Sequence, residues 1–307
     1  MTGAELGRGA IPQVQSVAAV IVDYFTTIHA LKLTELLRTE GIDDIVLVDN
    51  SVRGATRAAM PIGVAGQVQI VESPRNSGFG SGMNLGARAT AADLIVMANP
   101  DTVPAAGSVE RLVEALERDQ RLALVGPTLL EANGSVHQSA RAFPTVRRSA
   151  LHAMSSAIWS MGQISQDYRT RNWDHSRQRC VDWVSGAFFV VRREAFEAVG
   201  GFDPTYFMYV EEVDLCWRLR SAGWRVGYIE DEVTHLGGAS GKGRPFYMQL
   251  ARHRSLWRFT VATTSGVDRL LLPIVATMLS VRLALVCSRE LASRLRSASG
   301  RRASSKK

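Results

Sequence analysis

Cysteine is scarce in this chain of 307 residues. Its three cysteines, Cys180, Cys216 and Cys287, are widely separated and form neither a CxxC pair nor the Cys/His spacing of a zinc site. An odd number of cysteines also argues against a disulfide framework. The sequence therefore indicates a protein of a reducing compartment without a structural zinc ion.

The chain also lacks the features of a secretory leader. Residues 1–15 have neither the basic start nor the continuous apolar run of a signal peptide. We expect them to form a short disordered lead-in to the folded part.

Acidic residues are few at the C-terminus, although the whole chain carries a net charge of only +7. Residues 289–307 hold seven basic residues and one acid, and the preceding segment 270–287 is apolar apart from Pro273 and Arg282. A charge at the centre of a membrane-spanning helix costs roughly 2.5–3.5 kcal/mol. We therefore expect residues 264–307 to form a helix lying in the membrane interface, with its basic tail on anionic lipid. The alternative is a helix packed on the domain. No nucleic-acid-binding motif accompanies the charge, which argues against a nucleic-acid partner.

Short apolar runs alternate with helical patterns between residues 17 and 126. The predicted strands are 17–25, 45–51, 68–73, 93–101 and 122–127. The predicted apolar helix faces are Ile28, Leu31, Leu36 and Leu37 in the first helix, and Val109, Leu112, Val113 and Leu116 in a later one. Such alternation predicts βαβ units and a mostly parallel sheet, whose ligands bind beyond the carboxyl ends of the strands.

The second half of the chain is less regular. Residues 128–182 lose the alternation and are rich in arginine. The expected elements beyond them are a strand 187–191, a helix 193–199, a helix from near Tyr209, a strand 225–229, a glycine-rich loop 235–243 and a helix 246–262. We therefore divide the chain at residues 16, 128 and 264, with 16–127 and 128–263 as two halves of one domain.

The string NSGFGSGMNLG at 76–86 holds four glycines. It follows the third predicted strand rather than the first, so it does not match the dinucleotide fingerprint, and no lysine follows the glycines as in a Walker A loop. We interpret it as a turn whose following helix presents its N-terminus to a ligand.

Several carboxylates also follow strand ends or begin helices. Asp49 ends a predicted strand and can accept hydrogen bonds from a ligand or cap a turn. The NPD stretch 99–101 offers the oxygen ligands that Mg²⁺ or Mn²⁺ prefers, although it is also an ordinary turn sequence. His235 precedes a glycine loop and is a candidate metal ligand or a structural histidine.

The predicted helix at 209–224 carries neighbouring glutamates. Glu211, Asp214 and Arg218 share one face, so we expect them to form a ladder of salt bridges. Glu212 is rotated about 100° from Glu211 and has no partner in that ladder. It is a candidate general base, and the alternative is a solvated glutamate that pairs with the helix dipole.

Together and in this order, these segments resemble the inverting GT-A glycosyltransferases of family 2. The matching strings, within residues 17–260, are VIVDYF, LVDNS, NSGFGSGMNLG, NPD, SGAFFVVRREAFEAVGGFD, YVEEVDLCWRLRSAGW and HLGGASG. The resemblance implies an α/β fold with a mostly parallel sheet flanked by helices, in which 16–127 binds a nucleotide sugar and 128–263 binds the acceptor. Residues 132–153 are similar to the bacterial cell-wall rhamnosyltransferases that act on polyprenyl-diphosphate-linked N-acetylglucosamine.

The resemblance also implies roles for single residues. Glu212 would deprotonate the acceptor hydroxyl, and Asp101 and His235 would bind Mg²⁺ or Mn²⁺. The donor-binding residues would be Tyr24, Asp49, Asn50, Arg75, Asn76, Gly78, Asn84, Asn99, Asp101 and Lys242. The acceptor-binding residues would be Ser185, Gly186, Ala187 and Glu211. Two positions depart from the family pattern, since Asn99 replaces the first acid of its DxD-like motif and Glu212 replaces an aspartate.

The expected activity is transfer of a sugar, with inversion, from a nucleotide donor such as dTDP-L-rhamnose to a lipid-diphosphate acceptor. The expected place is the cytoplasmic face of the plasma membrane, with peripheral or monotopic attachment. Family members are often dimers, so a homodimer is compatible with the sequence. Two alternatives stay open: a family 2 enzyme with another donor or acceptor, and a non-catalytic nucleotide-sugar binder, which the departures at Asn99 and Glu212 favour.

Overall fold

A computed structural model describes residues 15–51, 54–60, 68–137, 139–146, 179–237 and 245–304. Lys242, the lead-in 1–14 and most of the arginine-rich stretch lie outside the described residues.

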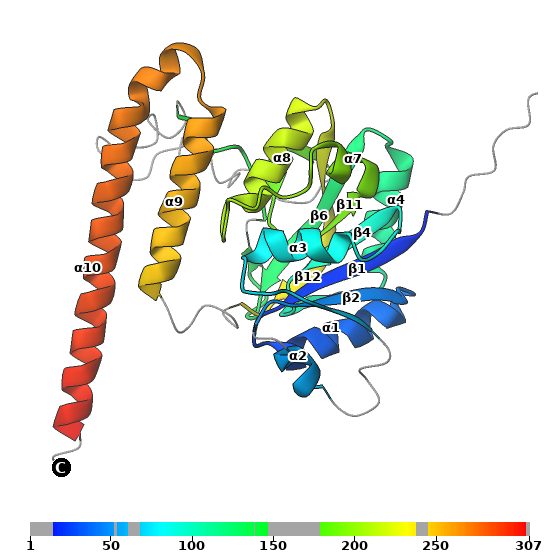
Figure 1. Ribbon diagram of the computed structural model, residues 1–307, viewed down its shortest axis with the longest axis horizontal. Coiled ribbons are helices and arrows are strands. Elements are labelled where there is room, and N and C mark those ends of the chain that lie inside the picture. Colours follow the sequence, from blue (N-terminus) through cyan, green and yellow to red (C-terminus); the bar gives the residue numbers. More distant parts are fainter. Residues whose placement is uncertain are drawn as a thin grey trace, which may run out of the picture.

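The first half of the chain forms the strand–helix units that its sequence predicts (Figure 1). Its main strands are β1 (Val17–Asp23), β2 (Asp44–Asp49), β3 (Gln69–Glu72), β4 (Leu94–Ala98) and β6 (Leu122–Glu131). Its helices are α1 (Thr27–Thr39), α2 (Ala55–Ala58), α3 (Phe79–Ala87) and α4 (Ser108–Arg118), and a short strand β5 (Thr102–Pro104) follows the NPD turn.

The second half adds strands to the same sheet. Its long strands are β11 (Phe188–Arg192) and β12 (Arg225–His235), and its helices are α7 (Arg193–Ala198), α8 (Glu211–Ser221), α9 (Pro245–Thr263), η1 (Gly266–Leu271) and α10 (Leu272–Ser304). Two short strands, β7 (Val136–His137) and β9 (Arg179–Val181), pair with β6 and β12 of that sheet, whereas β8 (Ala140–Arg141) and β10 (Trp183–Val184) pair with each other in a separate two-stranded sheet.

The order of the main sheet is β3-β2-β1-β4-β11-β6-β12-β5. The strands β3, β2, β1 and β4 are parallel, as are β6 and β12, whereas β11 runs antiparallel to both of its neighbours. The start of β11 therefore lies at the same edge as the ends of β1, β2 and β4. Because the strands on either side of β1 are β2 and β4, the chain reverses its direction of winding there, and ligands bind at such a point in open α/β sheets.

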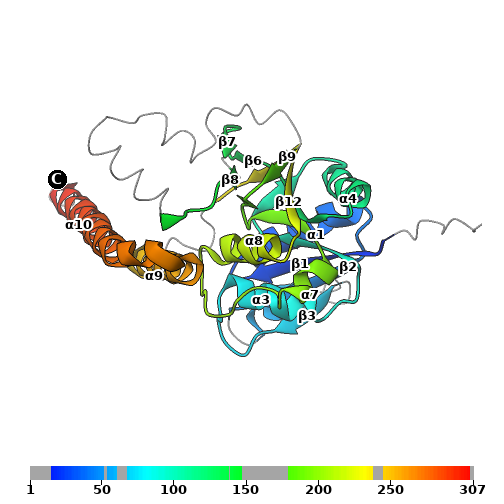
Figure 2. The ribbon, with the colours of Figure 1, turned by 90° about the horizontal axis from the view of Figure 1, so that it is seen from above.

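Helices cover both faces of the sheet (Figure 2). Alternate residues of β1 and β2 point to opposite faces: Val20 and Val48 belong to a core cluster with residues of α3, α7 and α8, whereas Ile21 and Leu47 belong to a second cluster with residues of α1 and α4. The predicted apolar face of α4 is confirmed, because Val109, Leu112 and Leu116 are buried and Val113 packs against them.

The apolar face predicted for α1 is only partly confirmed, because Leu37 is buried, Leu31 and Leu36 are partly buried, and Ile28 is not buried. The helix buries Ala30, Leu33, Thr34 and Leu37, while Ile28 is 82% exposed. The buried residues have the i, i+3, i+4, i+7 spacing of one helix face, and the hydroxyl of Thr34 donates to the carbonyl of Ala30. A polar residue can thus be buried in this face, which apolarity alone does not reveal.

The helices α9 and α10 form a hairpin beside the sheet (Figures 1 and 2). Helix α9 packs on the domain through the fully buried Phe259, whose ring lies 5.9 Å from that of Trp217 on α8. The segment Gly266–Ala292 is long and apolar enough to cross a membrane, with a mean hydropathy of 2.2, and only 6% of its most apolar window is buried. This exposure disfavours a helix packed on the domain and leaves an apolar C-terminal helix for membrane association.

Candidate active site

A cleft of about 670 Å³ opens at the carboxyl edge of the sheet. Its described lining residues are Val22, Tyr24, Asn50, Asn76, Phe79, Asn99, Pro100, Asp101, Ser185, Gly186, Ala187, Phe207, Met208, Tyr209, Glu211, Glu212, His235, Tyr247 and Met248. They come from the ends of β1, β2, β4 and β12, the start of β11, and the N-terminal parts of α3, α8 and α9. The fold therefore brings most of the predicted site residues into one cavity.

The two predicted metal ligands are neighbours across a pair of strands. His235 ends β12 opposite Thr102 of β5, and the Nε2 of His235 is 3.3 Å from the Oδ1 of Asp101. The backbone N–H of Leu236 also donates to the carbonyl of Asp101, which fixes the two segments together. Among the described residues no group of three or more His, Cys, Asp or Glu side chains surrounds a common point. Asp101 and His235 thus offer a cation two protein ligands, and water or a bound substrate would supply the others.

The NPD turn is hydrogen-bonded to the residues that lead into the neighbouring strand β11. The backbone N–H of Asn99 donates to the carbonyl of Ala187 at 2.7 Å, and its own carbonyl accepts from the hydroxyl of Thr102. The SGA stretch 185–187 therefore lies directly beside the NPD turn. A Cβ at Gly186 would be 3.3 Å from the Cβ of Glu212, so the missing side chain lets the glutamate approach this wall.

The two glutamates of α8 follow a strained backbone. Tyr209 and Val210 have φ angles of +66° and +71°, and a β-branched residue rarely adopts this left-handed conformation. Such strain persists where the surrounding structure imposes it, often at functional sites. Here it turns the chain into α8 so that Glu211 and Glu212 both line the cleft.

The expected ladder of salt bridges along α8 is only partly present. Arg218 pairs with Asp214 at 2.7 Å and donates to the carbonyls of Val199 and Gly201. Glu211 takes no part: it lines the cleft, and its Oε2 is buried without a hydrogen-bond partner among the described residues.

Burial raises the pKa of both glutamates. The pKa of Glu211 is raised well above its usual range, first by burial and then by the neighbouring charge of Glu212. Burial also raises the pKa of Glu212, while the positive charges of Arg141 and Arg252 act in the opposite direction. The site therefore places a carboxyl that favours its neutral form beside one that lies nearer to cations.

The opposite end of the cleft is built from amides and aromatic rings. The Nδ2 of Asn50 donates to the Oδ1 of Asn76 and to the carbonyl of Gly78, and its Oδ1 accepts from the N–H of Ser77. Tyr24 and Phe79 line the cleft beside them. This hydrogen-bond network fixes the loop that leads into α3. The amides of Asn50 and Asn76, together with the rings of Tyr24 and Phe79, suit a planar nucleotide base.

Four of the predicted donor-binding residues do not line the cleft. The carboxylate of the buried Asp49 accepts from the N–H groups of Ser51 and Thr56, Arg75 is exposed, and Gly78 lies against the backbone of Phe207. The side chain of Asn84 exchanges two hydrogen bonds with the backbone of Phe202. In this structure Asp49, Gly78 and Asn84 support the wall rather than form its surface, and the exposed Arg75 is not among the residues that line it.

Sequence reasoning missed several residues of the site. The carboxylate of Asp23 is fully buried and accepts four hydrogen bonds, from Thr26 (two), Thr27 and Thr56. Asp23 holds the loop after β1 in place. Its position at the end of a predicted strand is the sequence feature that could have identified it. No sequence motif identifies four further lining residues, because they reach the cleft only through tertiary packing: Phe207, Met208, Tyr247 and Met248.

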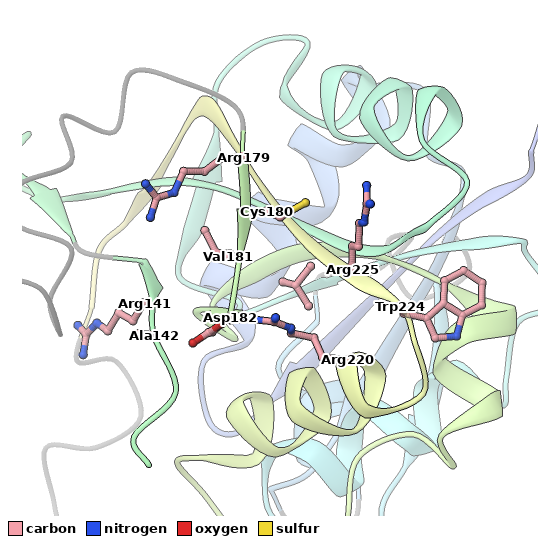
Figure 3. A pocket seen from close by; sticks show the side chains of 10 residues that line it. Arg141, Ala142, Arg179, Cys180, Val181, Asp182, Arg220, Trp224 and Arg225 are labelled. Carbon is pink, nitrogen blue, oxygen red and sulfur yellow. Dashed lines mark hydrogen bonds and ion pairs between the residues drawn. The ribbon is translucent and has the colours of Figure 1, made fainter. Parts of the chain in front are cut away.

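A second hollow, of about 500 Å³, lies beside β9 and the start of β12 (Figure 3). Its lining includes Arg141, Arg179, Arg220 and Arg225, but Arg220 pairs with Asp182 and Arg225 with Asp119. None of the predicted site residues lines it.

Comparison with known proteins gives one consistent result. Residues 33–261 match the family described as glycosyltransferase like family 2. The chain is 35% identical over 243 residues to an N-acetylglucosaminyl-diphospho-decaprenol L-rhamnosyltransferase of Mycobacterium tuberculosis, covering 75% of this chain and 78% of the relative.

Two solved structures share the fold at 14% sequence identity. GalNAc-T7 with UDP, GalNAc and Mn²⁺ superposes with a TM-score of 0.55 over 84% of this chain, which spans half (50%) of that protein. A mannosyltransferase of Pyrobaculum calidifontis with GDP-Man and Mn²⁺ superposes with a TM-score of 0.53, covering 92% of this chain and 81% of the other. The chain therefore belongs to glycosyltransferase family 2, and it is an inverting glycosyltransferase with a GT-A fold.

Proposed function

We propose that this enzyme transfers L-rhamnose from dTDP-L-rhamnose to N-acetylglucosamine linked to a polyprenyl diphosphate. The observation that carries the proposal is the 35% identity, over three quarters of the chain, to an enzyme named for that transfer. The cleft supports it, because it holds an amide and aromatic end for a nucleotide and a carboxylate end for an acceptor hydroxyl.

In this proposal Tyr24, Asn50 and Asn76 hold the nucleotide, with the buried Asp49 behind them and the exposed Arg75 next to Asn76 in the chain. The wall at Ser185, Gly186 and Ala187 holds the sugars between the two ends. Glu212 removes the proton of the attacking acceptor hydroxyl, and one displacement at the anomeric carbon inverts its configuration. Glu211, in its neutral form, donates a hydrogen bond to the acceptor.

The residues Asp101 and His235 fit a divalent cation. Their Oδ1 and Nε2 atoms are close enough to share one ion, and a carboxylate with an imidazole suits Mn²⁺ better than Mg²⁺, which prefers oxygen ligands. When bound, the cation neutralises charge on the departing nucleotide diphosphate. Asn99 in place of an acid makes the site less anionic, so we expect weaker metal binding than an aspartate there would give.

The apolar helix α10 and its basic end would hold the enzyme on the cytoplasmic face of the membrane, where a lipid-linked acceptor is anchored. The exposed residues Ile274, Val281 and Leu285 supply the apolar surface for this contact.

The test is transfer by the purified full-length enzyme to a prenyl-diphospho-N-acetylglucosamine. The donors are dTDP-L-rhamnose, UDP-galactose, UDP-glucose and GDP-mannose, each with Mn²⁺, with Mg²⁺, or with EDTA. We expect rhamnose transfer that EDTA abolishes and that Mn²⁺ restores better than Mg²⁺. Efficient transfer from another donor would refute the rhamnose assignment, and donor binding without any turnover would favour a non-catalytic binder.

A further inference from the structure

The wall of the cleft on the side of the hairpin is made by the first turns of α9. Tyr247 and Met248 line the cleft, and the ring of Tyr247 packs edge-on against Phe207 at 5.6 Å. Phe246 and Leu250, on the same turns, are partly exposed, and α9 continues to the turn that leads into α10. An acceptor with its lipid end in the membrane can therefore approach the cleft along α9.

The cleft is rich in carboxylates and poor in cations. It contains Asp101, Glu211 and Glu212, but none of the described residues that line it is a lysine or an arginine. An acceptor with a diphosphate next to its sugar needs a cation to pair with the diphosphate. Because the sugar ring lies between the reacting hydroxyl and the phosphate, this cation should be close to the base Glu212 but not in contact with it. The wall itself does not supply one.

Arg252 has this position. It lies on α9 one turn beyond Met248, and its positive charge acts on Glu212 at the cleft. Its guanidinium stacks on the ring of Tyr209, a lining residue, at 4.6 Å from the ring centroid. Stacking occupies the face of a guanidinium and leaves its edge of N–H donors available.

No residue in the described part of the chain is an ion-pair or hydrogen-bond partner of the Arg252 guanidinium. No described carboxylate forms an ion pair with Arg252, in contrast to Arg258 on the same helix, which approaches Asp203 at 3.9 Å. The side chain is exposed to solvent, so an arriving anion can reach it. The planar fork of a guanidinium matches two phosphate oxygens at once.

We propose that Arg252 binds the diphosphate of the lipid-linked acceptor at the mouth of the cleft and thereby makes the enzyme specific for diphosphate-linked sugars. The proposal rests on the proposed function for the chemistry of the acceptor, but not on the identity of the donor sugar. Arg252 thus recognises the acceptor without touching the reacting atoms.

The test compares two acceptors with the same sugar, a prenyl-diphospho-N-acetylglucosamine and an uncharged octyl N-acetylglucosaminide. For Arg252→Gln we expect KM for the diphosphate acceptor to rise about tenfold, because the charge-assisted fork to two phosphate oxygens is lost at a position that is exposed to solvent and therefore screened. The KM for the octyl glycoside should not change. Arg252→Lys keeps the charge without the fork and should give an intermediate KM.

The matched control is Arg88→Gln, which removes the same charge from an exposed arginine at the far end of α3. We expect it to leave both KM values unchanged. An unchanged KM for the diphosphate acceptor in Arg252→Gln would overturn the proposal, and so would an equal rise for both acceptors, because the latter indicates a general effect on the cleft.

Calorimetric titration with the diphosphate acceptor, without sugar transfer, separates this proposal from the proposed function. Weaker binding by Arg252→Gln than by the wild type and by Arg88→Gln would support the contact even if the donor is not dTDP-L-rhamnose. Equal binding by all three proteins would overturn it even if rhamnose transfer is observed.

Discussion

Glu211 and Glu212 are neighbours in sequence, yet the fold gives their carboxyl groups different surroundings. Glu211 is 4% exposed and has a buried oxygen without a partner, whereas Glu212 is half-buried and lies within reach of the charges of Arg141 and Arg252. Burial favours the neutral form of both groups, and only Glu212 has cations to oppose it. Pairs of carboxyl groups with pKa values pushed apart in this way divide the roles of proton donor and base.

The base assignment predicts a large loss of activity in Glu212→Gln. We expect kcat to fall by about 10³-fold, within the range that positioned general bases contribute, while donor binding is retained. A rate at or near that of the wild type would refute the assignment. Glu212→Asp is the matched control for charge, and its loss should be about 10²-fold, because the carboxylate is drawn back by roughly 1 Å.

The same assignment predicts a pH dependence with a definite sign. A base must be deprotonated to act, so activity rises with pH through the pKa of Glu212, and burial places this rise above the usual range of glutamate. Arg252→Gln removes a charge that lowers this pKa and should move the rise to higher pH. The measurement is kcat/KM as a function of pH for the wild type and for Arg252→Gln, with the octyl glycoside as acceptor.

At the scale of elements, the glycines of α3 and its N-cap are needed mainly because other parts of the protein lie too close for a side chain. Gly78 has a φ of +95°, and a Cβ there would lie 2.0 Å from the carbonyl oxygen of Phe207. A Cβ at Gly86 would lie 2.3 Å from a methyl group of Val20 on β1. The string that resembles a nucleotide loop therefore lets α3 lie close to β1 and to the loop before α8.

Gly78→Ala should be strongly destabilising. We expect the free energy of unfolding to fall by about 3 kcal/mol or more, because backbone strain and a clash with the Phe207 backbone add up. The control is Gly134→Ala, with a φ of +79° but no atom within 4 Å of an added Cβ, which should cost roughly 1 kcal/mol. Urea unfolding of both variants measures the difference, and equal losses would show that the contact with Phe207 is unimportant.

At the scale of the whole molecule, the chain has a folded catalytic domain and, beside it, a hairpin of α9 and the apolar α10. The described side chains of α10 expose Ile274, Met278, Val281 and Leu285, each at least 40% accessible. Exposed apolar surface on this scale is unfavourable in water and indicates a contact with lipid or another protein.

The double variant Val281→Glu and Leu285→Glu should abolish binding to vesicles that contain anionic lipid, because two charges enter the apolar surface of α10. Activity on a water-soluble acceptor should persist, since these residues lie outside the cleft. Val136→Glu, at a residue that is 51% exposed on β7, is the control and should bind vesicles like the wild type. Sedimentation with vesicles measures this, and full binding by the double variant would refute a role of α10 at the membrane.

The sequence by itself determined the α/β architecture and most of the cleft. Strands followed by polar residues place Tyr24, Asn50 and Asn99–Asp101 at one edge, because parallel strands all end on the same side of a sheet. Local pattern is enough for this, since strand direction and the order of elements fix where each strand end lies.

Only the tertiary structure decided which side chains face the cleft and which support it. The side chains of Asp49 and Asn84 bond to backbone groups rather than face the cleft, and Glu211 takes no part in its expected ladder of salt bridges. Helix α1 buries Ala30, Leu33 and Thr34 together with the predicted Leu37, and leaves Ile28 exposed. Tyr247 and Arg252 reach the site from a helix whose sequence carries no motif. Such contacts join residues far apart in the chain, and their geometry depends on packing that no local sequence pattern specifies.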